Sequence, residues 1–409
     1  MSSAPERKEF AATKQMKAVM GKYFADLARG PAEGRKTAWC TSVGPAELLR
    51  GMGFHVFFPE NHGAMLGAAK MATDLIPLAN AEGFSPDICS YLTSDIGSFL
   101  KNETPLQKMG LPGVPPADVL VFNTNQCRDV KDWFQWYARR WNVPCLGIHT
   151  PRAISEVDEA LVDYVAGQMQ ALIEPLERVS GRKFDIAELR AAVDLSRQCT
   201  MLWKQVLEAS AHVPSPITFF DGTIHMGPAV VLRGLQDAVD YYRLLVQELQ
   251  ERIAGGVAAV AGERLRIYWE GMPIWGKLRD LSTQFLQLRA CVVASTYCNS
   301  WIFEDLDPAD PFRSMARAYS SIFICRSDDY KERYIERMVE KYRIDGIVYH
   351  DAKTCPNNSN SRYQLPQRLR ERLGKPFLII NGDLNDLRLY SEEQTRTNIE
   401  AFAEQLTQG

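Results

Sequence analysis

The sequence has no excess of charge of one sign and no long hydrophobic run. Its 47 Lys and Arg residues nearly balance 50 Asp and Glu residues, and the basic residues are spread along the 409-residue chain, which gives little electrostatic support for binding nucleic acid. No run of eighteen apolar residues occurs, and the start, MSSAPERKEF, lacks the apolar core of a signal peptide. We therefore expect a cytoplasmic protein that binds neither nucleic acid nor a membrane.

Two short motifs are also missing. No GxGxxG fingerprint follows a predicted strand, which argues against a nicotinamide cofactor. None of the nine cysteines forms a CxxC pair, which argues against a zinc ribbon and a thioredoxin-like redox site. In a reducing compartment disulfides are not expected either, so each cysteine is a buried thiol, a metal ligand or a nucleophile. Any metal site must combine cysteines that lie far apart in the sequence.

Short apolar runs, typical of buried strands, alternate with helical segments and form two sets of four. The first set is TAWCTSV (37–43), HVFFP (55–59), DVLVFNTN (118–125) and VPCLGIHT (143–150), and the second is RLRIYWEG (264–271), ACVVASTY (290–297), IDGIVYH (344–350) and PFLIIN (376–381). The stretch 151–212 has a helical pattern throughout. This order predicts an α/β fold: two parallel-sheet domains, 1–150 and 216–409, joined by a helical bridge at 151–215.

Three cysteines lie in polar loops at the end of a predicted strand or the start of a helix. They are Cys89 in SPDICSYLTSD, Cys127 in NTNQCRDV and Cys355 in HDAKTCPNN. Thiolates from three separate loops can hold three corners of a 4Fe-4S cluster and leave the fourth iron open. The alternative is that all are ordinary buried thiols, since free cysteine is often buried. We interpret Cys145, Cys199, Cys291 and Cys325 as core thiols, and leave Cys40 and Cys298 undecided.

Further polar and aromatic side chains follow the predicted strands, where open α/β sheets bind their ligands. We assign Glu60 and His62 to proton delivery, and Thr41, Ser42, Trp269 and Glu270 to substrate binding. The alternatives are an ordinary helix start after Ser42, a solvated surface histidine and aromatic packing at the domain junction. If the three loop cysteines meet between the domains, all six residues should line one cavity.

Several segments resemble one known family, the benzoyl-CoA reductases and 2-hydroxyacyl-CoA dehydratases. The opening CTSVGPAELLRGMGFHVFFPENHGAMLG is similar to the start of that family, and GDLNDLRLYSEEQTRTNIEAFAEQL resembles its closing signature. DICSYLTSDIG, NTNQCRD and DGIVYHDAKTCPNN are similar to its three cluster-cysteine loops, in the same order. The resemblance covers about residues 35–405. One departure is Arg128, where many dehydratases have Asp.

The resemblance implies two Rossmann/flavodoxin-like domains with a 4Fe-4S cluster in the cleft between them, held by Cys89, Cys127 and Cys355. It also implies a paralogous cluster-bearing subunit, and an ATP-hydrolysing activator with ferredoxin as electron donor. The substrate would be an acyl-CoA or aryl-CoA thioester. We expect reduction of the benzoyl-CoA ring to a cyclic diene. The alternatives are dehydration of an (R)-2-hydroxyacyl-CoA to an enoyl-CoA and an electron-relay subunit, which a fourth ligand at Cys40 would favour.

Overall fold

The first half of the chain folds around a four-stranded parallel sheet. The computed structural model describes residues 9–358 and 364–408. The strands β1 (Thr37–Cys40), β2 (His55–Phe57), β3 (Val119–Asn123) and β4 (Cys145–Ile148) are arranged in the order β2-β1-β3-β4. Every residue of β1 and β3 is buried, as expected of parallel strands with helices on both faces. The helices of this half are α1 (Ala12–Arg29), α2 (Ala46–Gly51), α3 (Pro59–Ala68), α4 (Ala72–Ala81), α5 (Ser90–Lys101) and α6 (Asp129–Trp141), with 3₁₀ turns η1 (Gly30–Glu33) and η2 (Pro105–Met109).

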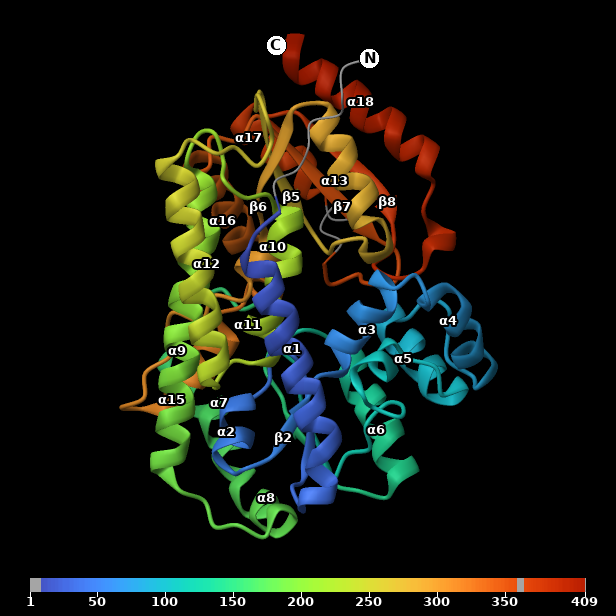
Figure 1. The fold of residues 1–409 in the computed structure, drawn as a ribbon, viewed down its shortest axis with the longest axis vertical. Coiled ribbons are helices and arrows are strands. Elements are labelled where there is room, and N and C mark those ends of the chain that lie inside the picture. The colour runs from blue at the N-terminus through green and yellow to red at the C-terminus, as the bar shows by residue number, and fades with distance from the viewer. Residues whose placement is uncertain (1–8, 359–363, 409) are drawn as a thin grey trace.

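Helices occupy the middle of the chain. They are α7 (Glu159–Ala171), α8 (Ile173–Ser180), α9 (Ile186–Glu208), the 3₁₀ turn η3 (Ala209–Ala211), α10 (Phe219–His225), α11 (Gly227–Val231) and α12 (Gln236–Ala254). Asp158 and Asp185 cap α7 and α9 by accepting backbone N–H groups, both at 2.8 Å. Gly181 ends α8 in a left-handed conformation, with φ of 68°. Figure 1 shows α9 and α12 side by side along one edge of the molecule.

The second half repeats the topology of the first. Its strands β5 (Leu265–Glu270), β6 (Ala290–Ser295), β7 (Gly346–Ala352) and β8 (Phe377–Gly382) are parallel, in the order β6-β5-β7-β8. The helices are α13 (Leu278–Gln287), α14 (Thr296–Asn299), α15 (Pro311–Ser320), α16 (Asp328–Lys341), α17 (Leu365–Leu373) and α18 (Glu392–Gln408), with 3₁₀ turns η4 (Trp275–Lys277), η5 (Phe323–Cys325) and η7 (Leu387–Leu389). All eight strands that the sequence predicted are therefore present, and both sheets are of the expected Rossmann/flavodoxin type.

This strand order determines where a ligand can bind. In each sheet the direction of winding reverses between the first and third strands in sequence, β1 and β3 in one and β5 and β7 in the other. The loops at the carboxyl ends of such a strand pair separate and leave a crevice. The cysteine-containing loops at 124–128 and 353–358 follow β3 and β7 directly.

Helix α1 packs against α11 and α12 of the middle segment (Figure 1), and it also contacts β2 and η2 of the first half. Its amino end is held by α12, where the carboxylate of Glu248 accepts the N–H groups of Ala11 and Ala12 at 3.0 and 2.9 Å. Further along, Lys22 forms an ion pair with Asp237 at 2.7 Å. Within the described ranges, no helix combines the length and the apolar character needed to cross a bilayer.

Candidate functional site

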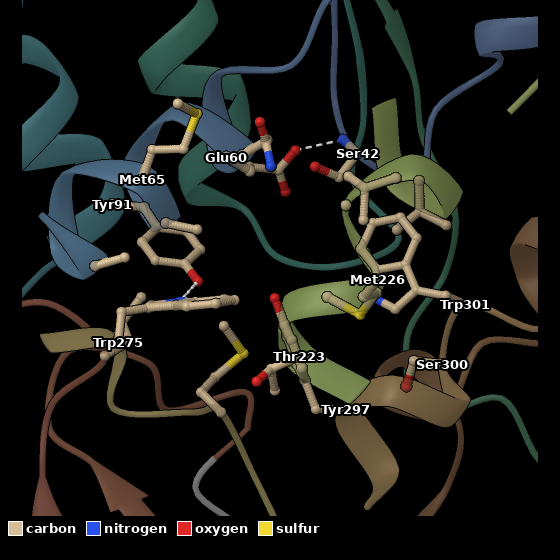
Figure 2. Close-up of a pocket in the computed structure, with 18 of the residues that line it drawn as sticks. Ser42, Glu60, Met65, Tyr91, Thr223, Met226, Trp275, Tyr297, Ser300 and Trp301 are labelled. Carbon is tan, nitrogen blue, oxygen red and sulfur yellow. Dashed lines mark hydrogen bonds between the residues drawn. The ribbon is translucent and has the colours of Figure 1, made fainter. Parts of the chain in front are cut away.

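A cavity of about 560 Å³ lies where the carboxyl-end loops of the two sheets face each other. Its lining is mostly apolar and comes from both halves of the chain and from α1. Figure 2 shows Met65, Tyr91 and Trp275 on one side of this cavity, and Met226 and Trp301 on the other. A largely apolar cavity with a few polar groups is the usual form of a site for a small organic ligand.

Cys89, Cys127 and Cys355 all line this cavity, although Cys355 lies 228 residues beyond Cys127 in the sequence. They share one local geometry, in which the sulfur accepts the backbone N–H of the residue three positions later. Those donors are Leu92, Val130 and Asn358. The Asn358 side-chain amide adds a contact of 3.7 Å to the sulfur of Cys355. N–H groups directed at sulfur favour the thiolate, so they lower the pKa of each thiol against the larger, opposing effect of burial.

The pKa values of the three thiols are all raised, by burial and by negatively charged neighbours. Burial raises the pKa of all three thiols, that of Cys355 to about 11. The Cys89 pKa is raised further by Cys127 and Cys355, which places the three sulfurs within electrostatic reach of one another. Three thiolates in such a place need a cationic group between them.

A multi-iron group fits this donor set better than a single ion does. Among the described residues, no three His, Cys, Asp or Glu side chains gather closely enough to hold one metal ion. In a cluster each thiolate binds a different iron, so the sulfurs lie farther apart than they would around one zinc. Cys89, Cys127 and Cys355 are half-buried thiols from separate loops that line one cavity without gathering around a single point, which fits this requirement.

Glu60 and Asp129 are the carboxyl residues among the described residues of the cavity lining, and Glu60 has a raised pKa. It lies in the first turn of α3, and its carboxylate accepts the backbone N–H of Ser42, which also lines the cavity (Figure 2). Burial raises the Glu60 pKa to about 7, against the opposing effect of the Ser42 hydrogen bond. A carboxyl group that titrates near neutral pH can both donate and accept a proton, so Glu60 is suited to the expected proton delivery.

His62 lies on the same helix but faces a different environment. Its Nδ1 is 2.5 Å from Asp95 and its Nε2 is 2.7 Å from Thr104. The same Asp95 carboxylate accepts the Trp133 indole N–H at 2.9 Å and the Tyr137 hydroxyl at 2.7 Å. Both ring nitrogens are thus engaged in a fully buried network, and His62 is not part of the cavity lining. The sequence predicted His62 in the cavity, whereas in the structure it lies in this buried network.

Three other expected residues lie one layer behind the lining. Thr41 is fully buried and its hydroxyl accepts a backbone N–H from β3 at 3.0 Å. The Trp269 indole donates to the carbonyl of Met272 at 3.2 Å, and Glu270 accepts the hydroxyl of Thr296. Met272 and Thr296 do line the cavity. Of the six residues expected there, Ser42 and Glu60 reach it, while Thr41, Trp269 and Glu270 support its wall.

Sequence reasoning did not assign several of the lining residues. The Tyr91 hydroxyl accepts the Trp275 indole N–H and interacts with the Tyr297 hydroxyl, which forms a polar edge on an otherwise apolar wall. Tyr91 lies two residues after Cys89, and Tyr297 lies two residues after the end of β6. These positions could have indicated that both residues reach the cavity. For Met226 and Trp301 the sequence carried no such signal.

Helix α1 and the 3₁₀ turn η2 contribute the remaining part of the lining. Met16, Met20 and Phe24 of α1 are apolar, whereas Lys17 of α1 and Lys108 of η2 are exposed cations. The two elements are in contact. The cavity is therefore apolar inside and carries positive charge where it reaches the protein surface.

Comparison with known proteins identifies the family. The family model for 2-hydroxyglutaryl-CoA dehydratase, D-component, matches residues 41–406. The chain is 29% identical over 394 residues to the (R)-2-hydroxyisocaproyl-CoA dehydratase alpha subunit of Clostridioides difficile, and 28% identical over 397 residues to the lactoyl-CoA dehydratase alpha subunit of Anaerotignum propionicum, covering 94% of each chain in both cases. It is 28% identical over 420 residues to a benzoyl-CoA reductase subunit of Thauera aromatica, covering 98% of this chain and 95% of that one. With nearly its whole length matched, the chain belongs to the family of benzoyl-CoA reductases and 2-hydroxyacyl-CoA dehydratases.

Proposed function

We propose that this chain is the iron–sulfur subunit of an enzyme that reduces a CoA thioester with single low-potential electrons. The observation that supports this most strongly is the convergence of Cys89, Cys127 and Cys355 on one apolar cavity, each with an N–H group at its sulfur. These three thiolates would hold a 4Fe-4S cluster. When bound, such a cluster supplies electrons one at a time, at a potential set by its hydrogen bonds and burial.

The protein's own side chains would handle the substrate. The apolar walls exclude water from the acyl group, and Glu60 holds a proton at its carboxyl group within the same cavity. Ser42 keeps that carboxyl oriented through its backbone N–H. The CoA portion is large and anionic, so we place it toward the surface near Lys17 and Lys108.

We propose benzoyl-CoA ring reduction to a cyclic diene, the first choice from the sequence, as one of two candidate reactions. It adds two electrons and two protons to the ring, whereas dehydration of an (R)-2-hydroxyacyl-CoA loses water without net reduction. The second reaction is an equal candidate, because the matching family model and two of the relatives above are named as dehydratases. Arg128, the residue that departs from the dehydratase pattern, is exposed and is not part of the cavity lining, so it does not favour either substrate.

An electron-relay subunit is the less favoured alternative. A relay cluster would have a fourth protein ligand, and Cys40 was the nearest candidate in the sequence. Cys40 is fully buried at the end of β1 and is not part of the cavity lining. Its position supports a cluster with an open iron, which is the form that catalysis requires.

Further subunits are part of the proposal. The relatives are each named as one subunit of an enzyme, two of them as alpha subunits, which indicates assemblies of unlike chains. We propose that this chain pairs with a paralogous cluster-bearing subunit. An ATP-hydrolysing activator, itself reduced by ferredoxin, would supply the electrons.

Iron and sulfide analysis after anaerobic purification tests the cluster. Replacement of Cys89, Cys127 or Cys355 by Ser should abolish iron binding, whereas Cys199→Ser and Cys325→Ser should leave it unchanged, because both of these thiols are buried away from the cavity. If both groups of variants kept their iron, the proposed ligands would be wrong.

Product analysis tests the reaction. The complex with its reduced activator is incubated with benzoyl-CoA and with a panel of (R)-2-hydroxyacyl-CoA thioesters, and the products are separated by mass. A gain of two hydrogens indicates ring reduction, and a loss of water indicates dehydration. Turnover with NADH alone would contradict the low-potential mechanism.

A further inference from the structure

One buried carboxylate joins the two cysteine loops that come from different halves of the chain. Asp383 follows directly after β8 and is fully buried. Its carboxylate accepts hydrogen bonds from Ser90, the residue after Cys89, and from Thr354, the residue before Cys355. Both partners are also buried.

The hydrogen bonds form a closed ring. Asp383 Oδ1 accepts the Ser90 hydroxyl, and Oδ2 accepts the Thr354 hydroxyl at 2.6 Å and the Thr354 backbone N–H at 2.9 Å. The Thr354 hydroxyl oxygen in turn accepts the Ser90 backbone N–H at 3.1 Å. Two more N–H groups, from Asn385 and Asp386, fix Oδ1 at 3.0 Å each. The carboxylate therefore has little freedom to move, and neither cysteine loop can shift without breaking a buried bond.

A second carboxylate links the cysteines within the first half. Asp129, two residues after Cys127, accepts the backbone N–H of Cys89 at 3.2 Å. Asp129 thus ties Cys127 to Cys89, and Asp383 ties Cys89 to Cys355. The loops that carry the three cysteines are thus tied together across two sheets.

We propose that Asp383, acting through Ser90 and Thr354, is a positioning residue that fixes the separation of Cys89 and Cys355 and thereby the fit of the cluster. The inference rests on the cluster proposed above. A residue with a merely structural role would stabilise the fold without changing how tightly iron is held. Ligand groups fixed by hydrogen bonds outside the coordination sphere bind metal more tightly, and losing such a partner typically weakens binding 10- to 100-fold.

Thr354→Val is the main test, because valine keeps the side-chain shape and the backbone N–H but removes the hydroxyl that both donates to Asp383 and accepts from Ser90. The rate at which a ferrous chelator removes iron from the anaerobic protein should rise about tenfold, and the EPR g-values of the reduced protein should shift. Thr354→Ser, which restores the hydroxyl, should return the release rate to within about twofold of the original and restore the original g-values.

Thr200→Val is the matched control. Thr200 is equally buried, and its hydroxyl also donates one hydrogen bond and accepts one: it donates to the Trp301 carbonyl and accepts the Phe303 N–H. Its iron release should stay within about twofold of the original, whatever happens to its melting temperature. If Thr354→Val fails to fold, Ser90→Ala, which loses one hydroxyl bond, should still release iron several-fold faster.

The outcomes separate this inference from the one on which it rests. If the Cys89, Cys127 and Cys355 variants keep their iron, the proposed cluster is wrong. If they lose iron while Thr354→Val and Ser90→Ala release it no faster than Thr200→Val, the cluster stands and the positioning role of Asp383 is refuted.

Discussion

Replacing Glu60 by Gln should remove a pH dependence from the stability of the protein. The Glu60 pKa rises from an ordinary 4.5 to about 7 on folding, chiefly because the carboxyl group is buried. At 1.36 kcal/mol per tenfold change in acidity, this rise corresponds to about 3 kcal/mol. Relaxation of the protein around a buried charge lowers this cost, so we expect about 1–3 kcal/mol.

The sign follows from proton binding. Between pH 4.5 and 7 the folded protein holds this proton more tightly than the unfolded chain does, so the free energy of unfolding falls as the pH rises. Below pH 4.5 both states are protonated and the group has no effect, and above pH 7 the full cost is present. Gln does not ionise, so Glu60→Gln should gain stability relative to the original protein across this window.

The assay is urea denaturation of the metal-free protein at intervals from pH 4 to 8, since a cluster would add its own charge. The difference in unfolding free energy between Glu60→Gln and the original protein should rise by about 1–3 kcal/mol and level off near pH 7. In the complete enzyme, we expect the rate to change near pH 7 as Glu60 ionises, and this change should be absent from the residual activity of Glu60→Gln. A difference that stays flat across this range would refute the assigned pKa.

Two further predictions concern buried contacts. Arg233 lies 3.3 Å from Glu47, and both side chains are almost fully buried. Arg233→Met should therefore lower the unfolding free energy by about 3–5 kcal/mol, because it leaves the Glu47 charge unpaired, and adding Glu47→Gln should recover much of this loss. A double variant no more stable than the single one would contradict this pairing. A Cβ at Gly67 would lie 2.0 Å from Asn385 Oδ1, so Gly67→Ala should cost about 1–3 kcal/mol in thermal unfolding. Gly167→Ala, in the open on α7, should instead gain up to about 1 kcal/mol, and equal melting temperatures for the two alanine variants would argue against the close approach at Gly67.

The sequence was sufficient to predict the two sheets, because each strand is a short run of β-branched, aromatic and small apolar residues between polar loops. A run such as VLVFN, buried on both faces in β3, has few other ways to be buried. The three loop cysteines were identified for a related reason, since polar loops after parallel strands converge on one edge of a sheet.

The sequence was less informative about the positions of individual side chains. Glu60 and His62 are two residues apart on a helix, so they point about 200° apart, and one cavity cannot receive both. Trp269 and Glu270 lie inside β5, where helices and loops cover both faces, so they support the cavity wall without reaching the cavity. The contribution of α1 to the lining depends on contacts with residues more than 200 positions away, which no local pattern reveals.

This separation in sequence also delays the packing of α1 during protein synthesis. The bonds between the start of α1 and Glu248 join residues 236 and 237 positions apart. At 5–20 residues per second, α1 is complete about 10–50 s before α12 emerges to receive it. During that interval its apolar side, including Met16, Met20 and Phe24, has no partner on α11 or α12. The cavity is therefore completed late, after most of the chain has been made, and a nascent chain stalled before residue 248 would expose the surface that later lines it.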